Sequence, residues 1–190
     1  MEKAAFEKLK IELSVQAKNG LDFIVAATII WLIVAYIWAM SYSSYDKSIL
    51  TFVVGSGTIP LAWGFSKILK TNWKTPDNPL EPLGLWLNFA QLFYFPFLVF
   101  ILLKYPGYFV MTYAIITGAH FFPYAWYYRS TPYAIMAGVI SVGTMFIGLV
   151  SAEADMYRIP LFMAASLVVL AFWLYAAYKR NEREWKQGSE

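Results

Sequence analysis

The sequence contains no cysteine and a single histidine, His120, among its 190 residues. The lack of cysteine excludes disulfide bonds, thiolate catalysis and cysteine-based metal sites. One imidazole, with the acidic residues confined to the ends of the apolar segments, cannot complete the coordination shell of a zinc or di-iron centre. We therefore expect neither a metal nor a cofactor.

Charged side chains are scarce too, at 14% of the residues, whereas a soluble domain carries about a quarter. Hydrophobic residues make up 59%, which leaves too little polar surface to cover a globule in water. The 15 Lys and Arg lie beside most of the 12 Asp and Glu, so the net charge of +3 does not indicate nucleic-acid binding. We expect the lipid bilayer as the partner of this chain, and no nucleic acid.

Long uncharged windows define the expected fold. Six windows lack Asp, Glu, Lys and Arg, and each approaches or exceeds the ~20 residues that an α-helix needs to cross the hydrocarbon core. The alternation expected of a membrane β-barrel is absent. The sequence therefore predicts an all-α, polytopic membrane bundle of six transmembrane helices. The expected spans are residues 23–45, 48–66, 82–103, 105–128, 130–152 and 159–178.

The segments that flank this transmembrane domain, residues 21–178, are polar. In residues 1–20 the apolar side chains recur at helical spacing opposite charged ones, which predicts a short amphipathic helix. Such a helix either senses the membrane or docks a partner, or it lies against its own bundle. Residues 179–190 are expected to form a polar tail.

The distribution of cations predicts the orientation. Twelve of the 15 Lys and Arg fall on the side of the two termini, and the other three are Lys47, Lys104 and Arg158. Cytoplasmic loops of membrane proteins carry the excess of Lys and Arg. We therefore expect both termini, the amphipathic helix and the tail to be cytoplasmic, in agreement with an even number of spans.

Two segments carry a resemblance to a known family. They are NPLEPLGLWLNFAQLFYFPFLVF at residues 78–100 and VMTYAIITGAHFFPYAWYYRS at residues 110–130. Together they resemble an uncharacterised family of small bacterial multi-span membrane proteins, the YoaS-like proteins, which the remaining helices resemble only in hydropathy. The resemblance implies a multi-pass protein of the bacterial plasma (inner) membrane. It implies no activity, substrate or catalytic residue.

Polar side chains within the expected spans are candidates for function, because hydrocarbon penalises them unless they are paired. Asn88 and Gln91 precede the turn near Lys104 by about as many residues as His120 follows it, so a rise of ~1.5 Å per residue places all three at one depth. They form either a ligand or proton site, or interhelical hydrogen bonds that fix the packing. Pro96 and Pro123 are expected to kink the two helices beside this cluster.

Aromatic residues surround the same hairpin. Tyr94, Tyr113 and Tyr124 place hydroxyl groups on aromatic walls, which suit an apolar, aromatic or quaternary-ammonium ligand. We add Ser56 to these candidate binding residues because GSGTIP at residues 55–60 interrupts the second span near the bilayer midplane. Ser56 and His120 are also the only nucleophile and base that a membrane hydrolase would have.

Three functions remain open. The first is binding or transport of a small apolar, aromatic or cationic molecule in a pocket around His120. The second is a structural or partner-binding role without a ligand site, for which a homodimer is one form. The third is an intramembrane hydrolase that uses Ser56 and His120. We expect the first and do not expect an enzyme.

Overall fold

The computed structural model describes residues 3–187, and residues 1, 2 and 188–190 lie outside the described part. Every regular element in that part is helical. In chain order, the elements are α1 (Lys3–Gln16), η1 (Lys18–Gly20), α2 (Leu21–Ala39), α3 (Ser44–Ser56), α4 (Thr58–Leu69), α5 (Glu81–Leu92), α6 (Phe95–Lys104), η2 (Pro106–Tyr108), α7 (Phe109–His120), α8 (Phe122–Tyr127), α9 (Pro132–Val150), η3 (Glu153–Asp155) and α10 (Arg158–Gln187), where η marks a single 3₁₀ turn.

The all-α membrane fold is confirmed at this level. Within the described residues, five helical segments are long and apolar enough to cross a membrane. They contain α2, α3 with α4, α5 with α6, α9, and α10. The remaining expected span, the fourth at residues 105–128, forms η2, α7 and α8, and its longest unbroken helix has only 12 residues. Five spans are thus supported by length and composition.

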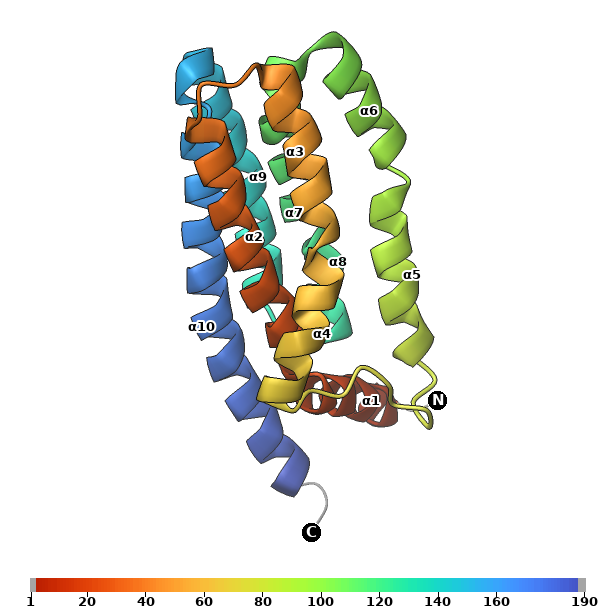
Figure 1. Ribbon diagram of the computed structural model, residues 1–190. Coiled ribbons are helices and arrows are strands. Elements are labelled where there is room, and N and C mark those ends of the chain that lie inside the picture. Colours follow the sequence, from red (N-terminus) through yellow and green to blue (C-terminus); the bar gives the residue numbers. More distant parts are fainter. Residues whose placement is uncertain (1–2, 188–190) are drawn as a thin grey trace.

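The continuous helices α2, α9 and α10 form a closely packed group on one side of the bundle (Figure 1). Helix α2 packs along α10, and α9 packs along both α7 and α10. The interface buries Val34, Ile140, Leu167, Leu170 and Leu174 completely. By contrast, α5 buries no residue, and α5 with α6 stands at the edge of the bundle in Figure 1.

Three of the bundle's segments are interrupted, each a few residues before a proline. Proline lacks a backbone amide hydrogen, and its ring clashes with the carbonyl four residues earlier, so a helix kinks or ends there. The last residues of α3, α5 and α7, paired with the proline that follows, are Ser56 and Pro60, Leu92 and Pro96, and His120 and Pro123. The expected kinks at Pro96 and Pro123 are therefore breaks, and a third break lies in the second segment.

At each interruption the chain makes one tighter turn, in which an amide donates to the carbonyl three residues earlier. The three bonds run from Gly57 N to Val54 O at 3.0 Å, from Tyr94 N to Gln91 O at 3.1 Å, and from Phe121 N to Gly118 O at 3.1 Å. Helices α2, α9 and α10 run without such a break. The bundle thus combines three continuous helices with three segments that break part-way.

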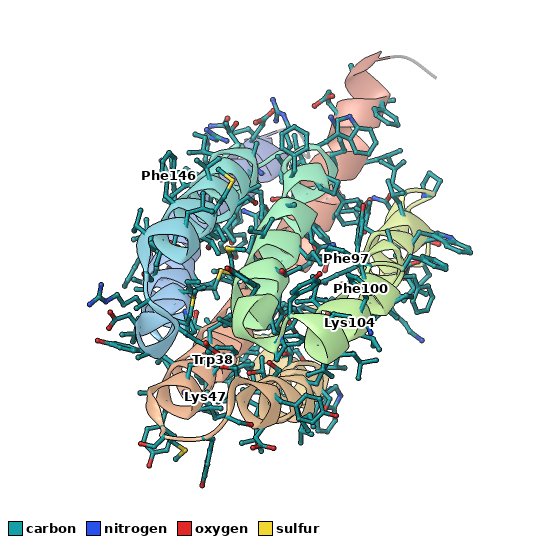
Figure 2. All side chains as sticks on the ribbon, turned by 90° about the horizontal axis from the view of Figure 1, so that it is seen from above. Trp38, Lys47, Phe97, Phe100, Lys104 and Phe146 are labelled. Carbon is teal, nitrogen blue, oxygen red and sulfur yellow. The ribbon has the colours of Figure 1, made fainter. Side chains whose placement is uncertain are left out.

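The first span ends earlier than expected. We predicted 23–45, but α2 ends at Ala39, and Tyr45 belongs to α3. The hydroxyl of Ser43 accepts a hydrogen bond from the Asp46 amide at 3.2 Å and so caps a new helix. Beside this turn, the ammonium of Lys47 donates to the carbonyl of Trp38 at 3.2 Å near the end of α2, where a cation is favourable (Figure 2).

Helix α1 lies across one end of the bundle, next to the end of α10 (Figure 1). The Asn181 carboxamide on α10 donates to the Ser14 hydroxyl at 2.8 Å. Asn78, in the connection between α4 and α5, donates to the carbonyl of Leu9 at 2.9 Å. The N-terminal helix therefore packs against its own bundle, and α10 continues through the expected tail as far as Gln187.

Candidate functional site

His120 is the last residue of α7, at the break that precedes α8. Its half-buried ring meets the ring of Tyr124 edge-on, with 5.2 Å between the centroids. The imidazole has no hydrogen-bond partner among the side chains and backbone groups of residues 3–187. Because a neutral imidazole has one donor and one acceptor, both remain available here.

The register between α5 and α8 is set by a glycine. A β-carbon at position 84 would lie 2.7 Å from the hydroxyl oxygen of Tyr127, so only glycine allows this approach. The same hydroxyl donates to the carbonyl of Glu81 at 3.3 Å. Helix α5 also packs against α7, and the two run in opposite directions (Figure 1). The start of α5 is therefore level with the end of α8.

This register aligns two of the candidate residues. Gln91 follows Gly84 by seven residues, and His120 precedes Tyr127 by seven. Residues seven apart lie on one face of a helix, about 10 Å apart along its axis. Since the segments are antiparallel, both steps lead from the contact of Gly84 with Tyr127 to about the same depth. On α5 the step stays on one helix face, whereas the step from Tyr127 to His120 crosses the break at Phe121, so this packing defines the depth of the imidazole and not its direction. The expected common depth of Gln91 and His120 thus agrees with the packing.

Asn88 lies on the same face of α5, four residues after Gly84, yet its side chain is exposed. Its amide nitrogen donates to the carbonyl of Gly84 at 2.9 Å, within its own helix. No hydrogen bond in the described part of the chain joins Asn88, Gln91 and His120 to one another. These side chains therefore do not form the mutual hydrogen bonds that would fix the hairpin.

The expected aromatic wall has three separate parts. Tyr113 lies among aromatic rings of α2, α3 and α7, with centroids 5.4 Å from Trp31 and 6.4 Å from Phe52. Tyr124 is buried and stacks on Tyr128, with centroids 5.9 Å apart. Tyr94, at the break between α5 and α6, is 57% exposed. Of the three tyrosines, only Tyr124 has a ring contact with the imidazole.

Ser56 does not pair with His120. Its hydroxyl donates to the carbonyl of Val53 at 2.7 Å, and its side chain is exposed. The neighbouring Gly55 lies against the hydroxyl of Tyr113, since a β-carbon there would be 2.9 Å from that oxygen. Tyr113 precedes His120 by seven residues, about 10 Å along the helix axis. The structure thus provides no hydrogen bond between a nucleophile and a base at this pair.

Two cavities are open at the surface, and none of the seven candidate residues lines either of them. One, of about 560 Å³, lies where α1, α8 and α10 meet. The other, of about 360 Å³, lies beside the start of α3. No group of three or more potential metal ligands occurs between residues 3 and 187. The candidate residues around His120 therefore line neither of these two cavities.

Comparison with known proteins places this architecture in a family. A model described as a family of unknown function (DUF7010) matches residues 6–177, from α1 to the last third of α10. The chain belongs to this family. No curated protein and no solved structure matches the chain. This membership agrees with the expectation of an uncharacterised family, and it assigns no activity to the chain.

A buried carboxylate with several hydrogen bonds is one residue of this family member that sequence analysis missed. Asp22, 1% exposed, accepts hydrogen bonds from the Thr71 hydroxyl and the Trp73 indole, both at 2.6 Å. One oxygen also accepts from the amide of Phe23 at 3.0 Å. Its position directly before an uncharged window was the available signal.

A second polar group lies beside it at the junction of α1 and α2. Lys18, Asn19 and Gly20 all have positive φ, a left-handed conformation that turns the chain between the two helices. Asn19 is fully buried, accepts from Ser14 at 2.7 Å and donates to the carbonyl of Leu174 at 3.0 Å. These bonds satisfy buried polar atoms, so this group fastens α1 to the bundle.

Proposed function

We propose that the chain is a six-span protein of the bacterial plasma membrane with both termini in the cytoplasm. In addition to the five continuous or long segments, the broken segment of α7 and α8, which packs against α9, forms the fourth span in chain order. In support, α1 and the last turns of α10 lie at the same end of the bundle (Figure 1), and most of the cations lie toward that end in the sequence. The resemblance of residues 78–100 and 110–130 to bacterial proteins supports the location.

We further propose that the protein binds or transports a small apolar, aromatic or cationic molecule between α5 and α7 with α8. The observation that carries this proposal is the pair of Gln91 and His120. Both residues lie at about the same depth on neighbouring antiparallel segments, and neither has a hydrogen-bond partner in the described residues. Polar groups left unpaired at hydrocarbon depth are costly, so a ligand that pairs with them is strongly favoured.

The broken helices support a site that admits a molecule from the bilayer. The break at Phe93 and Tyr94 and the break at Phe121 both lie within a turn or so of this pair. Interrupted helices in transport proteins place substrate sites near the bilayer midplane. Asn88 lies on the same face of α5 as Gly84, which packs on α8, yet its side chain is exposed. This face of α5, next to Gln91, is therefore accessible from the surface of the bundle.

In this proposal each candidate residue has a defined part. The imidazole of His120 and the amides of Gln91 and Asn88 offer hydrogen bonds to the polar group of the ligand. The ring of Tyr124 supports the imidazole, and the exposed Tyr94 covers an aromatic or cationic ligand from above. Tyr113 lies about two helical turns from His120, next to the break between α3 and α4 where Ser56 lies. In this proposal these two residues line the end of the site nearest that break.

The test uses two probes, indole as a neutral aromatic molecule and tetraphenylphosphonium as an aromatic cation. The purified chain in lipid nanodiscs is titrated with each probe, and uptake of the same probes is followed in proteoliposomes. We expect His120→Ala and Gln91→Leu each to weaken binding of at least one probe by about fivefold to tenfold, the value of one lost hydrogen bond.

The matched control is Thr112→Ala on the same helix. The Thr112 hydroxyl donates to the carbonyl of Tyr108 at 3.0 Å, one turn earlier, so its loss leaves no facing group unpaired. We expect the control variant to bind both probes as the original chain does. Saturable binding that survives both substitutions, or no saturable binding of either probe, would contradict the proposal.

A partner-binding role is the second candidate, and the exposure of α5 favours it. Trp86, Phe89 and Phe93 are 68%, 43% and 83% exposed, and no residue of α5 is buried. In this case a second copy of the chain covers α5, and Asn88 pairs across the dimer. Asn88→Leu then reduces the dimer fraction in light scattering while probe binding by the monomer persists.

A further inference from the structure

The larger cavity lies at the α1 end of the bundle and is lined by basic side chains from three parts of the chain. Lys10 comes from α1, Arg129 from the turn between α8 and α9, and Arg180 from α10. Trp126 and Glu184 complete its polar and aromatic edge. The cavity does not overlap the interface around His120, so this inference is independent of the proposed function.

Two of the three cations are held in position by carboxylates. The ammonium of Lys10, only 7% exposed, lies 2.6 Å from a carboxylate oxygen of Glu7 and 5.1 Å from the Trp126 ring centroid. The guanidinium of Arg129 lies 3.3 Å from Glu7 and 2.6 Å from Glu184. These ion pairs use only some of the N–H donors of Lys10 and Arg129, because an ammonium has three donors and a guanidinium has five.

Arg180 differs from these two cations. It lines the cavity, is exposed, and has no ion pair or hydrogen bond with any residue from 3 to 187. The five groups Lys10, Arg129, Arg180, Glu7 and Glu184 therefore carry a net charge of +1, with one guanidinium free. A planar guanidinium beside partly used donors matches the oxygens of a phosphate group.

The surroundings indicate that the phosphate belongs to a lipid. Phe122, one turn before Trp126 on the same face of α8, is 64% exposed, and Trp126 is 47% exposed. On α10, Trp173 lies two turns before Arg180 and is 42% exposed. From the cavity, exposed apolar surface thus continues along both helices in the direction of the bilayer, where acyl chains lie. Tryptophan at this level is typical of the membrane interface.

We propose that this cavity binds the phosphate headgroup of an anionic phospholipid from the leaflet at the α1 end, with Arg180 as its free ligand. Basic pockets between membrane helices recognise anionic headgroups by this combination of charge and adjoining apolar surface. A bound lipid would bridge α1, α8 and α10 and thereby hold the N-terminal helix against the bundle.

The test is native mass spectrometry of the full chain released from detergent micelles that contain equal amounts of phosphatidylglycerol and phosphatidylcholine. The variants are Arg180→Gln and, as a control of equal charge on the same helix, Arg183→Gln, which does not line the cavity. We expect the original chain and Arg183→Gln to retain phosphatidylglycerol preferentially. Arg180→Gln should lower that retention about fivefold to tenfold.

Several results would overturn the proposal. An equal loss in both variants would mean that phosphatidylglycerol follows overall charge rather than this cavity. Equal retention of phosphatidylcholine would mean that no anionic headgroup is recognised. Displacement of phosphatidylglycerol by inorganic phosphate at millimolar concentration would assign the cavity to free phosphate. Melting curves of the two variants check that both are folded, and Arg180→Gln is expected to fold because Arg180 has no partner in the described chain.

Discussion

The hydrogen bonds to Asp22 lead to a quantitative prediction about how α2 is joined to the connection after α4. One oxygen of the carboxylate accepts from both the Thr71 hydroxyl and the Trp73 indole at 2.6 Å. Asp22 also lies in the first turn of α2, where a negative charge is favourable. The other oxygen accepts from the Phe23 amide at 3.0 Å. In Asp22→Asn, an amide group replaces one of the two oxygens, so either the Phe23 amide or the Thr71 and Trp73 donors lose their acceptor, and the remaining bonds lose the negative charge.

The expected cost follows from these contacts. A hydrogen bond to a charged group contributes about 1.5–3 kcal/mol, and the charge at the helix start about 0.3–1 kcal/mol. We therefore expect Asp22→Asn to lower the free energy of unfolding by about 2–4 kcal/mol. Trp73→Phe removes one of the same bonds and keeps the aromatic contact with Phe23, whose ring centroid is 4.8 Å away. Because Trp73 is 39% exposed, water replaces part of the loss, and we expect about 1–2 kcal/mol.

The assay is equilibrium unfolding in mixed micelles of sodium dodecyl sulfate and dodecylmaltoside, followed by near-ultraviolet circular dichroism. If the carboxylate and the indole interact as the distance indicates, the double variant should be more stable than the sum of the two losses predicts, by about 1–2 kcal/mol. Additive losses, within about 0.3 kcal/mol, would refute the reasoning, because they would mean that the two side chains act independently.

Two further predictions concern helix packing and the break before α8. A β-carbon at Gly118 would lie 2.5 Å from a methyl carbon of Ile140, so Gly118→Val should lower the free energy of unfolding by about 1–3 kcal/mol. The control is Gly138→Ala, where a β-carbon meets no atom within 4 Å. This variant should leave the free energy of unfolding unchanged or raise it. Pro123→Ala restores an amide donor for the carbonyl of Ala119, so hydrogen exchange should show a protected amide at position 123. Rapid exchange of that amide would mean that other contacts, and not the proline, keep the helix broken.

The helical membrane fold could be predicted from the sequence because lipid imposes a simple requirement. A chain that crosses hydrocarbon must pair its own backbone amides, so uncharged runs of this length form helices. The breaks at Pro96 and Pro123 were foreseeable for the same reason, since a missing amide hydrogen is visible in the sequence. The end of the first span was not, because Met40 to Ser43 are uncharged and differ from a helix only through the cap that Ser43 forms.

The candidate site was predictable only in part. Counting residues from the turn placed Gln91 and His120 at one depth, and the contact of Gly84 with Tyr127 agrees with that placement. Counting could not show that Asn88 bonds within its own helix, because a carboxamide reaches the carbonyl four residues earlier as readily as a neighbouring helix. The orientation of each side chain depends on the packing of the facing helix.

By itself, the sequence determined that this chain is a bundle of membrane helices, and where prolines interrupt them, because both depend on the local balance of apolar side chains and backbone donors. Only the tertiary structure decided that Asp22 is paired with Thr71 and Trp73, and that three cations of distant segments line one cavity. These groups are up to 170 residues apart, from Lys10 to Arg180, and no local pattern relates them. They meet because α1 folds back across the end of the bundle, a contact that depends on long-range packing.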